Sequence, residues 1–192
     1  MSAVQSDALQ GGFENAPLDS ATAIRAIMNA LARPGEIETL EGARPPLPLS
    51  VAAGPFILTL CDPDTPIHLA GRHDCPDVRD WITFHTGAPF NGRQNASFAL
   101  GDWGSLLPLE PYPIGTAEYP DRSATLVVEL EKLEGSGVTL TGPGIKDHSA
   151  ISLPELNHFV QNTQAFPLGL DFFFTCANQL SGLPRTTKVE AA

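Results

Sequence analysis

Positive charge and cysteine are both scarce in this 192-residue sequence. Lys and Arg number 11 against 22 Asp and Glu, and the resulting formal net charge of −11 would repel a polyanion such as nucleic acid. The three cysteines, Cys61, Cys75 and Cys176, lie far apart and form no CxxC pair, which argues against a disulfide framework or a zinc knuckle. We therefore expect reduced thiols and no nucleic-acid partner.

Long apolar runs and targeting signals are also missing. No stretch approaches the roughly 20 apolar residues that a membrane-spanning helix requires. The first 17 residues have neither the basic region nor the apolar region of a secretory signal peptide. We therefore expect a soluble, cytoplasmic protein with no membrane partner.

The composition that remains is that of a folded globular protein. Apolar residues make up 42% of the chain and charged residues 17%, and the length suits one well-filled core. We expect residues 1–17 to be a flexible lead-in and residues 18–192 to form a single domain. The patterns predict helices over about 20–33, 49–60, 74–86 and 154–164, and strands over about 36–40, 66–70, 96–100, 123–130, 138–141 and 170–176.

Strands that alternate with helices are typical of an α/β fold. The sequence GSG at 135–137 predicts a hairpin that joins strands 123–130 and 138–141, and residues 178–189 predict a final edge strand or a tail. The fold class that follows is α/β, a three-layer sandwich with a mixed sheet.

Several candidate sites have a simpler structural explanation. Asp62 and Asp64 could hold a hard cation, but the proline-flanked sequence DPDTP favours an Asx-type turn. His85 ends a helix and is better placed to stabilise that end than to act in catalysis. The histidines form no metal-binding pair in the sequence, and apolar neighbours followed by acids predict an inert Cys61 thiol.

Catalytic motifs are absent from the sequence. It contains neither the GxSxG nucleophile elbow nor a GxxxxGK[ST] phosphate loop, and TGPG at 141–144 favours a tight turn over a phosphate nest because proline lacks an N–H. Lys132, Lys146 and Lys188 all lie in polar surroundings, whereas a Schiff-base lysine needs a desolvated pocket. We therefore predict no catalytic residue, no metal, no pyridoxal phosphate and no other cofactor.

The C-terminal segment PRTTK is the most distinctive polar cluster. Arg185, Thr186 and Lys188 could bind a phosphate, phosphonate or carboxylate anion, because cations and hydroxyls suit such groups. The alternative is a solvated edge strand whose charges prevent aggregation. The sequence leaves both readings open.

Six segments in order resemble one family. They are IRAIMNALARPG at 24–35, LTLCDPDTP at 58–66, FHTGAP at 84–89, LTGPGI at 140–145, FPLGLD at 166–171 and LPRTTKVE at 183–190. In this order and spacing the chain resembles the PhnH family, the H subunit of the bacterial carbon–phosphorus lyase system, from about Phe13 to Glu190.

The resemblance implies a fold similar to that of pyridoxal-phosphate-dependent transferases, without the cofactor site. It also implies a homodimer, and a core complex with the G, I and J subunits that couples a phosphonate to the ribose of ATP and releases adenine before the carbon–phosphorus bond is broken. It implies no catalytic residue for this subunit. We therefore expect a non-catalytic component of a transferase and lyase complex that acts mainly through protein–protein contacts, or alternatively one that contributes its own anion site.

Overall fold

A computed structural model of the protein describes residues 9–192, and its centre is a six-stranded mixed sheet. The strand order is β1-β8-β7-β4-β3-β2, with β2, β3, β4 and β7 parallel and β8 and β1 antiparallel to their neighbours. The strands are β1 (Glu38–Thr39), β2 (Ile67–Leu69), β3 (Phe98–Asp102), β4 (Thr125–Glu129), β7 (Asp171–Cys176) and β8 (Gln179–Leu183). The predicted mixed sheet is confirmed.

A second, antiparallel sheet has the order β6-β5-β9, formed by β5 (Val138–Thr141), β6 (Ser149–Ile151) and β9 (Lys188–Glu190). The predicted hairpin between 123–130 and 138–141 is therefore wrong. Both edges of β4 are occupied by β3 and β7, and β5 pairs with β6 and β9 instead. A strand flanked on both sides has no backbone groups left for its sequence neighbour.

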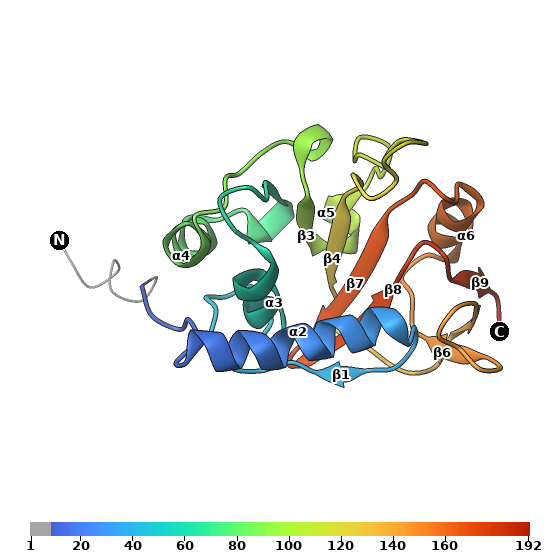
Figure 1. Ribbon diagram of the computed structural model, residues 1–192, viewed down its shortest axis with the longest axis horizontal. Helices are drawn as coiled ribbons and strands as arrows, with labels where there is room; N and C mark the ends of the chain where they lie inside the picture. The colour runs from blue at the N-terminus through green and yellow to red at the C-terminus, as the bar shows by residue number, and fades with distance from the viewer. Residues whose placement is uncertain (1–8) are drawn as a thin grey trace.

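Helices cover the two faces of the large sheet. One face carries α2 (Ala16–Ala32), α3 (Ala53–Leu60) and α4 (Pro76–Thr86), and the other carries α5 (Trp103–Leu106), α6 (Leu156–Gln164) and the small sheet. Figure 1 shows α4 and α6 at opposite ends of the molecule, with the sheet between them. This arrangement is the three-layer α/β sandwich that the sequence predicts.

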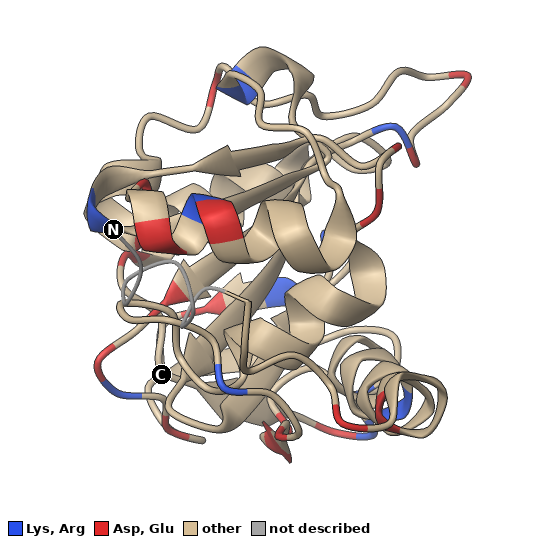
Figure 2. Ribbon diagram, turned by 90° about the vertical axis from the view of Figure 1, so that its left-hand side faces the viewer, with Lys and Arg blue, Asp and Glu red and all other residues tan. Residues whose placement is uncertain are grey.

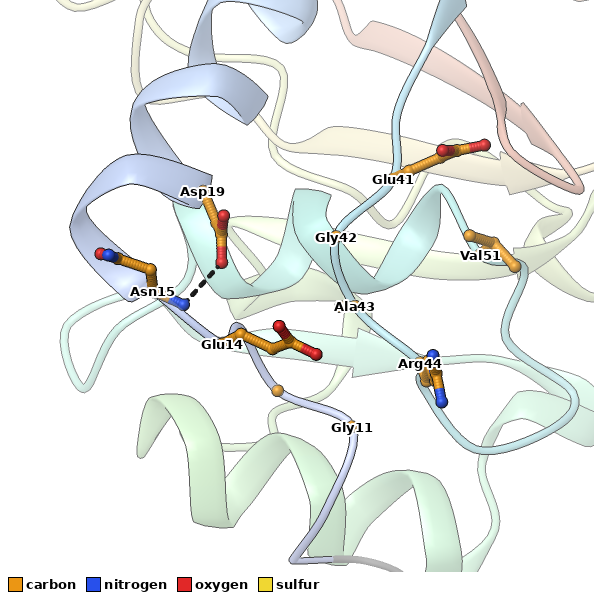
Figure 3. A pocket seen from close by; sticks show the side chains of 10 residues that line it. Gly11, Glu14, Asn15, Asp19, Glu41, Gly42, Ala43, Arg44 and Val51 are labelled. Carbon is orange, nitrogen blue, oxygen red and sulfur yellow. Dashed lines mark hydrogen bonds between the residues drawn. The ribbon is translucent and has the colours of Figure 1, made fainter.

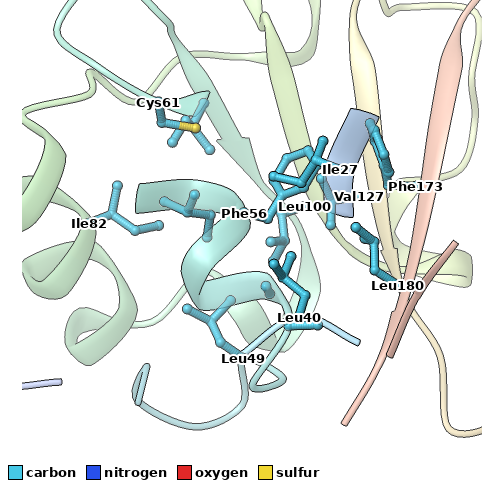
Figure 4. Close-up of a cluster of buried hydrophobic side chains, with 14 of the residues drawn as sticks. Ile27, Leu40, Leu49, Phe56, Cys61, Ile82, Leu100, Val127, Phe173 and Leu180 are labelled. Atoms are coloured by element: carbon cyan, nitrogen blue, oxygen red, sulfur yellow. The ribbon is translucent and has the colours of Figure 1, made fainter. Parts of the chain in front are cut away.

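Strand β7 connects the two halves of the core. Phe173 packs with α2 and α3 side chains such as Ile27 and Phe56 (Figure 4), whereas Phe172 and Phe174 point to the opposite face. Alternate side chains of a strand face opposite sides of the sheet, so the run FFF fills both core clusters at once. The predicted buried strand at 170–176 is confirmed.

The first long helix begins earlier than predicted. It starts at Ala16, with Pro17 in its first turn, and Asp19 accepts a hydrogen bond of 2.8 Å from the backbone N–H of Asn15. The segment before it contacts the body, since the Gln10 carbonyl accepts a hydrogen bond of 3.0 Å from Trp81 Nε1. Residues 1–8 of the expected flexible lead-in lie outside the described residues.

The C-terminal segment contributes to both sheets. The predicted final edge strand at 178–189 is instead two strands, with β8 placed between β1 and β7 and β9 in the small sheet. Gly182 in β8 permits this placement, because a Cβ there would lie 2.7 Å from the Ala30 carbonyl oxygen of α2. None of the helices within residues 9–192 has the length and apolar character needed to span a membrane.

Candidate functional site

The three residues predicted to bind an anion line one shallow pocket. Arg185, Thr186 and Lys188 surround a hollow of about 330 Å³ together with Pro143, Thr163 and Phe166. The pocket forms where the turn between β8 and β9 meets the end of α6. The sequence cluster is therefore also a cluster in space.

Arg185, however, is engaged inside the protein. Its Nε and Nη2 atoms donate hydrogen bonds of 3.2 and 2.5 Å to the two carboxylate oxygens of Asp171. Nη1 donates to the Pro120 carbonyl at 2.8 Å, and Nη2 also donates to Ser123 Oγ. The Arg185 side chain is only 11% exposed, so it is not the solvated edge charge considered as the alternative. Its bonds fasten β7 to the loop that precedes β4.

Lys188 is left as the open cation of this pocket. Its side chain is exposed on β9, whereas Thr187 beside it is buried and its carbonyl accepts a 2.9 Å hydrogen bond from Thr163. Anion binding by Arg185, Thr186 and Lys188 stays a prediction. The geometry gives Lys188 and Thr186 the contact with solvent and Arg185 a supporting position.

Other sequence predictions have clear outcomes. The turn at Asp62 is confirmed, because Asp62 Oδ1 accepts a 2.9 Å hydrogen bond from the Asp64 N–H and the Asp62 carbonyl accepts one of 3.1 Å from the Thr65 N–H. Burial, with Asp62 nearby, raises the pKa of the Cys61 thiol to about 12, as expected for an inert cysteine. The three lysines are all exposed, without the desolvation that an aldimine lysine needs.

A second polar cluster lies where the parallel strands end, and the sequence analysis missed it. Asp102, Glu129 and Thr175 are register partners at the carboxyl ends of β3, β4 and β7. Arg72 and His73 follow β2 in a short 3₁₀ turn. The carboxyl ends of parallel strands are the usual place for ligands in α/β sheets, so this carboxyl-end cluster is the position to examine.

Glu129 is fastened on both carboxylate oxygens. Oε1 accepts the Ser50 N–H at 2.8 Å and Oε2 accepts the Thr175 hydroxyl at 3.0 Å. Burial raises the pKa of Glu129 even though these hydrogen bonds and the charge of Arg72 oppose the shift. The carboxylate therefore ties the loop before α3 to the sheet and is not free to act as a base.

His73 is sealed beneath the same cluster. It has no exposed surface, and neither ring nitrogen makes a hydrogen bond with the described residues, although the Ala70 carbonyl lies nearby. Burial lowers the pKa of His73, and Arg72 lowers it further, against the opposing effect of Asp102. A neutral, inaccessible imidazole and an occupied carboxylate do not form an acid–base pair that a substrate could reach.

Replacing Glu129 by glutamine tests this structural role through pH. Because the folded protein holds the Glu129 proton more tightly than the unfolded chain, the stabilisation is complete below the ordinary pKa of 4.5 and declines as pH rises through the folded value. We expect Glu129→Gln to raise the free energy of unfolding by about 1 kcal/mol near pH 8 and to flatten the dependence on pH above 4.5. Urea unfolding between pH 4 and 8 measures both, with the exposed Glu131→Gln as control. An unchanged pH slope in Glu129→Gln would contradict the assignment.

The largest hollow of the described residues is acidic. It has a volume of about 640 Å³, and Figure 3 shows Glu14, Asp19 and Glu41 around it, with Arg44 at its side. Elsewhere, basic residues are scattered singly among acidic ones on the side shown in Figure 2. No group of His, Cys, Asp and Glu among residues 9–192 is placed to hold a metal ion.

No local pattern in the sequence reveals the carboxyl-end cluster. Its members come from four strands, and Glu129 is 79 residues from Ser50 and 46 from Thr175. The one usable signal is that an acid closes each of two apolar strand segments, FALGD and TLVVE. That signal predicts two carboxylates at one sheet edge, but not the partners that occupy them.

The fold and the two clusters define a class: a three-layer α/β protein whose buried charged groups mainly hold strands and loops together. Within that class, the chain belongs to the bacterial phosphonate metabolism protein (PhnH) family, whose model matches residues 11–190. The resemblance seen in the sequence is thereby confirmed.

Two characterised proteins are similar over most of their length. The alpha-D-ribose 1-methylphosphonate 5-triphosphate synthase subunit PhnH of Rhizobium meliloti (strain 1021) is 40% identical over 195 residues, which cover 97% of this chain and 98% of that protein. The putative C-P lyase subunit protein HtxG of Stutzerimonas stutzeri is 28% identical over 175 residues, 88% of this chain and 84% of that protein.

Proposed function

We propose that this chain is a subunit of the carbon–phosphorus lyase system for organic phosphonate breakdown. It would be needed for the step that couples a phosphonate to the ribose of ATP, with adenine released, before the carbon–phosphorus bond is cleaved. The observation that carries this proposal is the 40% identity, along almost the whole of both chains, to a subunit of a ribose 1-methylphosphonate 5-triphosphate synthase.

The mode of action we propose is protein–protein contact. Within the described residues the carboxyl-end cluster offers no accessible acid–base pair, because Glu129 is occupied and His73 is buried. Large apolar side chains are meanwhile exposed at several places: Leu18, Met28, Leu47, Phe84 and Phe166 are 57–84% exposed. Exposed apolar side chains are the usual material of subunit interfaces.

The partners we propose are a second copy of the chain and the G, I and J subunits of the same system. A stable homodimer would bury more than about 1,000 Å² in total. Sedimentation at micromolar concentration should then give twice the chain mass, and a single species of 20.4 kDa would argue against the dimer. A fold related to that of pyridoxal-phosphate-dependent transferases belongs to the same proposal.

The decisive experiment is reconstitution with and without this chain. The four proposed subunits are co-expressed, purified through a tag on a partner, and assayed for phosphonate-dependent release of adenine from ATP. We expect this chain to co-purify and the activity to fall at least tenfold when it is omitted. Full activity without it would overturn the proposal.

The C-terminal pocket supports a second candidate function, a contributed anion site. Lys188 and Thr186 face solvent beside the pocket, and Lys188→Gln removes the cation without disturbing an internal bond. The matched control is Lys132→Gln, which removes another exposed lysine, paired only with Glu134 at 2.9 Å. Anion binding by this pocket requires that Lys188→Gln, but not Lys132→Gln, lowers the activity of a complex that still assembles.

A further inference from the structure

A pocket of about 360 Å³ opens at the outer edge of the large sheet, beside β2. Residues 89–91 run along part of this edge, where the Asn91 N–H donates to the Ile67 carbonyl at 2.9 Å. Pro66 and Ala70 direct their backbone bonds toward β3, so by alternation the Leu69 backbone faces the pocket. We call this the β2-edge pocket; its lining is His68, Leu69, Asp74, Arg79, Phe90, Asn91 and Gly92.

Arg79 gives the pocket an oriented cation. Its Nε donates to Asp74, and its guanidinium carbon lies 4.6 Å from the centre of the Phe90 ring. These two contacts fix the plane of the guanidinium. The terminal nitrogens Nη1 and Nη2 make no hydrogen bond with residues 9–192, and the side chain is 42% exposed. A planar guanidinium with its terminal donors open suits a carboxylate or a phosphate-like oxyanion.

His68 stands on the other side of the pocket. Its Nδ1 lies 3.2 Å from the Asn91 carbonyl oxygen, so Nδ1 carries the proton and Nε2 is left without a partner among the described residues. The charged groups around the ring are Arg79, Arg93 and Asp74, and the Tyr112 ring packs edge-on at 6.1 Å. Two cations thus face one carboxylate, a local positive excess in a chain of net charge −11.

We propose that the β2-edge pocket binds a tetrahedral oxyanion of the phosphate or phosphonate class, held by the terminal donors of Arg79 and by Nε2 of His68. The Asn91 side-chain amide, on the pocket wall, is the third donor. The volume accommodates such a group with a small substituent, and Phe90 supplies an apolar wall for it. The site lies apart from the C-terminal pocket and shares no residue with it.

Binding at this site should take up a proton. Burial lowers the pKa of His68, and Arg93 and Arg79 lower it further, although the Asn91 carbonyl and Asp74 act in the opposite direction. In the empty pocket the imidazole is therefore neutral at pH 7, and a bound anion favours its protonated form. Affinity should rise as pH falls from 8 to 6.

The test is calorimetric titration of the full chain with inorganic phosphate, methylphosphonate and sulfate between pH 6 and 8. Sulfate keeps a constant charge over this range, so proton uptake on sulfate binding reports the protein alone. It is read from the difference in heat between two buffers of unlike ionisation enthalpy. We expect uptake in the unmodified chain and none in His68→Asn, and a preference for methylphosphonate or for phosphate then identifies the natural class of oxyanion.

Arg79→Gln should weaken binding at least tenfold, the loss expected for one charge-assisted hydrogen bond. The matched control is Arg33→Gln, which removes one arginine whose exposed side chain pairs only with Glu36 at 3.5 Å. Should Arg79→Gln fail to fold by circular dichroism, Arg79→Lys carries the test, with an expected loss of at least threefold. Equal weakening by the Arg79 and Arg33 variants, or no binding of any oxyanion at 20 mM, would overturn the proposal.

This inference does not depend on assembly with other subunits. A chain that binds the oxyanion but leaves reconstituted activity unchanged when omitted would support the pocket and contradict the proposed function. A chain that is required for activity and binds no oxyanion would do the reverse.

Discussion

Replacing Arg185 by alanine is expected to lower the free energy of unfolding by about 3 kcal/mol, the range found when one partner of a mostly buried ion pair is removed. Asp171, whose side chain is 25% exposed, would lose its bidentate partner, and Ser123 and the Pro120 carbonyl would each lose a hydrogen bond. Since these contacts join β7 to the loop before β4, their loss weakens the centre of the parallel sheet.

Equilibrium urea unfolding of the single variants measures this effect. Lys188→Ala, three residues along and exposed, is the control and should change stability by less than about 0.5 kcal/mol. Arg185→Lys keeps the charge but loses the bidentate geometry, so an intermediate loss is expected. If Arg185→Ala unfolds at the same urea concentration as the unmodified chain, the internal role of Arg185 is wrong.

The result also separates two meanings of a lost activity. A variant at Arg185 that fails in the reconstituted complex would show reduced stability as well, because its donors are used inside the fold. A variant at Lys188 that fails while remaining as stable as the unmodified chain would point to binding. The two residues lie close in sequence, but their substitution tests different properties.

Replacing Phe172 by alanine is expected to lower the free energy of unfolding by about 4 kcal/mol, near the middle of the range for a fully buried phenylalanine. Phe172 has no exposed surface, and its ring lies 5.0 Å from that of Phe159 and 6.4 Å from that of Phe174, measured between centres. It lies on β7, between the parallel strand β4 and the antiparallel strand β8, so the surrounding side chains have little freedom to fill the space left.

Phe84→Ala makes the same chemical change on the surface. Phe84 is 58% exposed on α4, and its replacement should cost less than about 1 kcal/mol. Thermal and urea unfolding of the two variants side by side gives the comparison. Equal losses in both variants would mean that β7 is not the tightly packed centre of the molecule.

Several elements follow from local sequence because their determinants lie within a few residues. The αL glycine Gly87, at φ 69°, ends α4 as predicted. The Asp62 turn closes through bonds that span only two and three residues. The run 170–176 forms a strand buried on both faces, and the ordered segments correctly identified the family. In each case the chain itself brings the interacting groups together.

Sequence reasoning failed where distant segments compete for the same partner. The turn at 135–137 predicts a hairpin, but β4 lies between β3 and β7, and this pairing is decided by the long-range assembly of the sheet. Arg185 presents the pattern of a surface anion site, yet Asp171, Ser123 and Pro120, which lie 14 to 65 residues away, take up its donors. Nothing within the segment PRTTK encodes those contacts.

The sequence by itself determined the fold class, the family, the inert cysteine and the poverty of catalytic motifs, because these depend on composition, short-range pattern and ordered segments. Only the tertiary structure decided which charges are exposed. It buried Glu129 and Arg185 among partners and left Lys188 and the terminal donors of Arg79 open. The physical reason is that a side chain's charge is fixed by its type, whereas its desolvation and its hydrogen-bond partners depend on segments far along the chain.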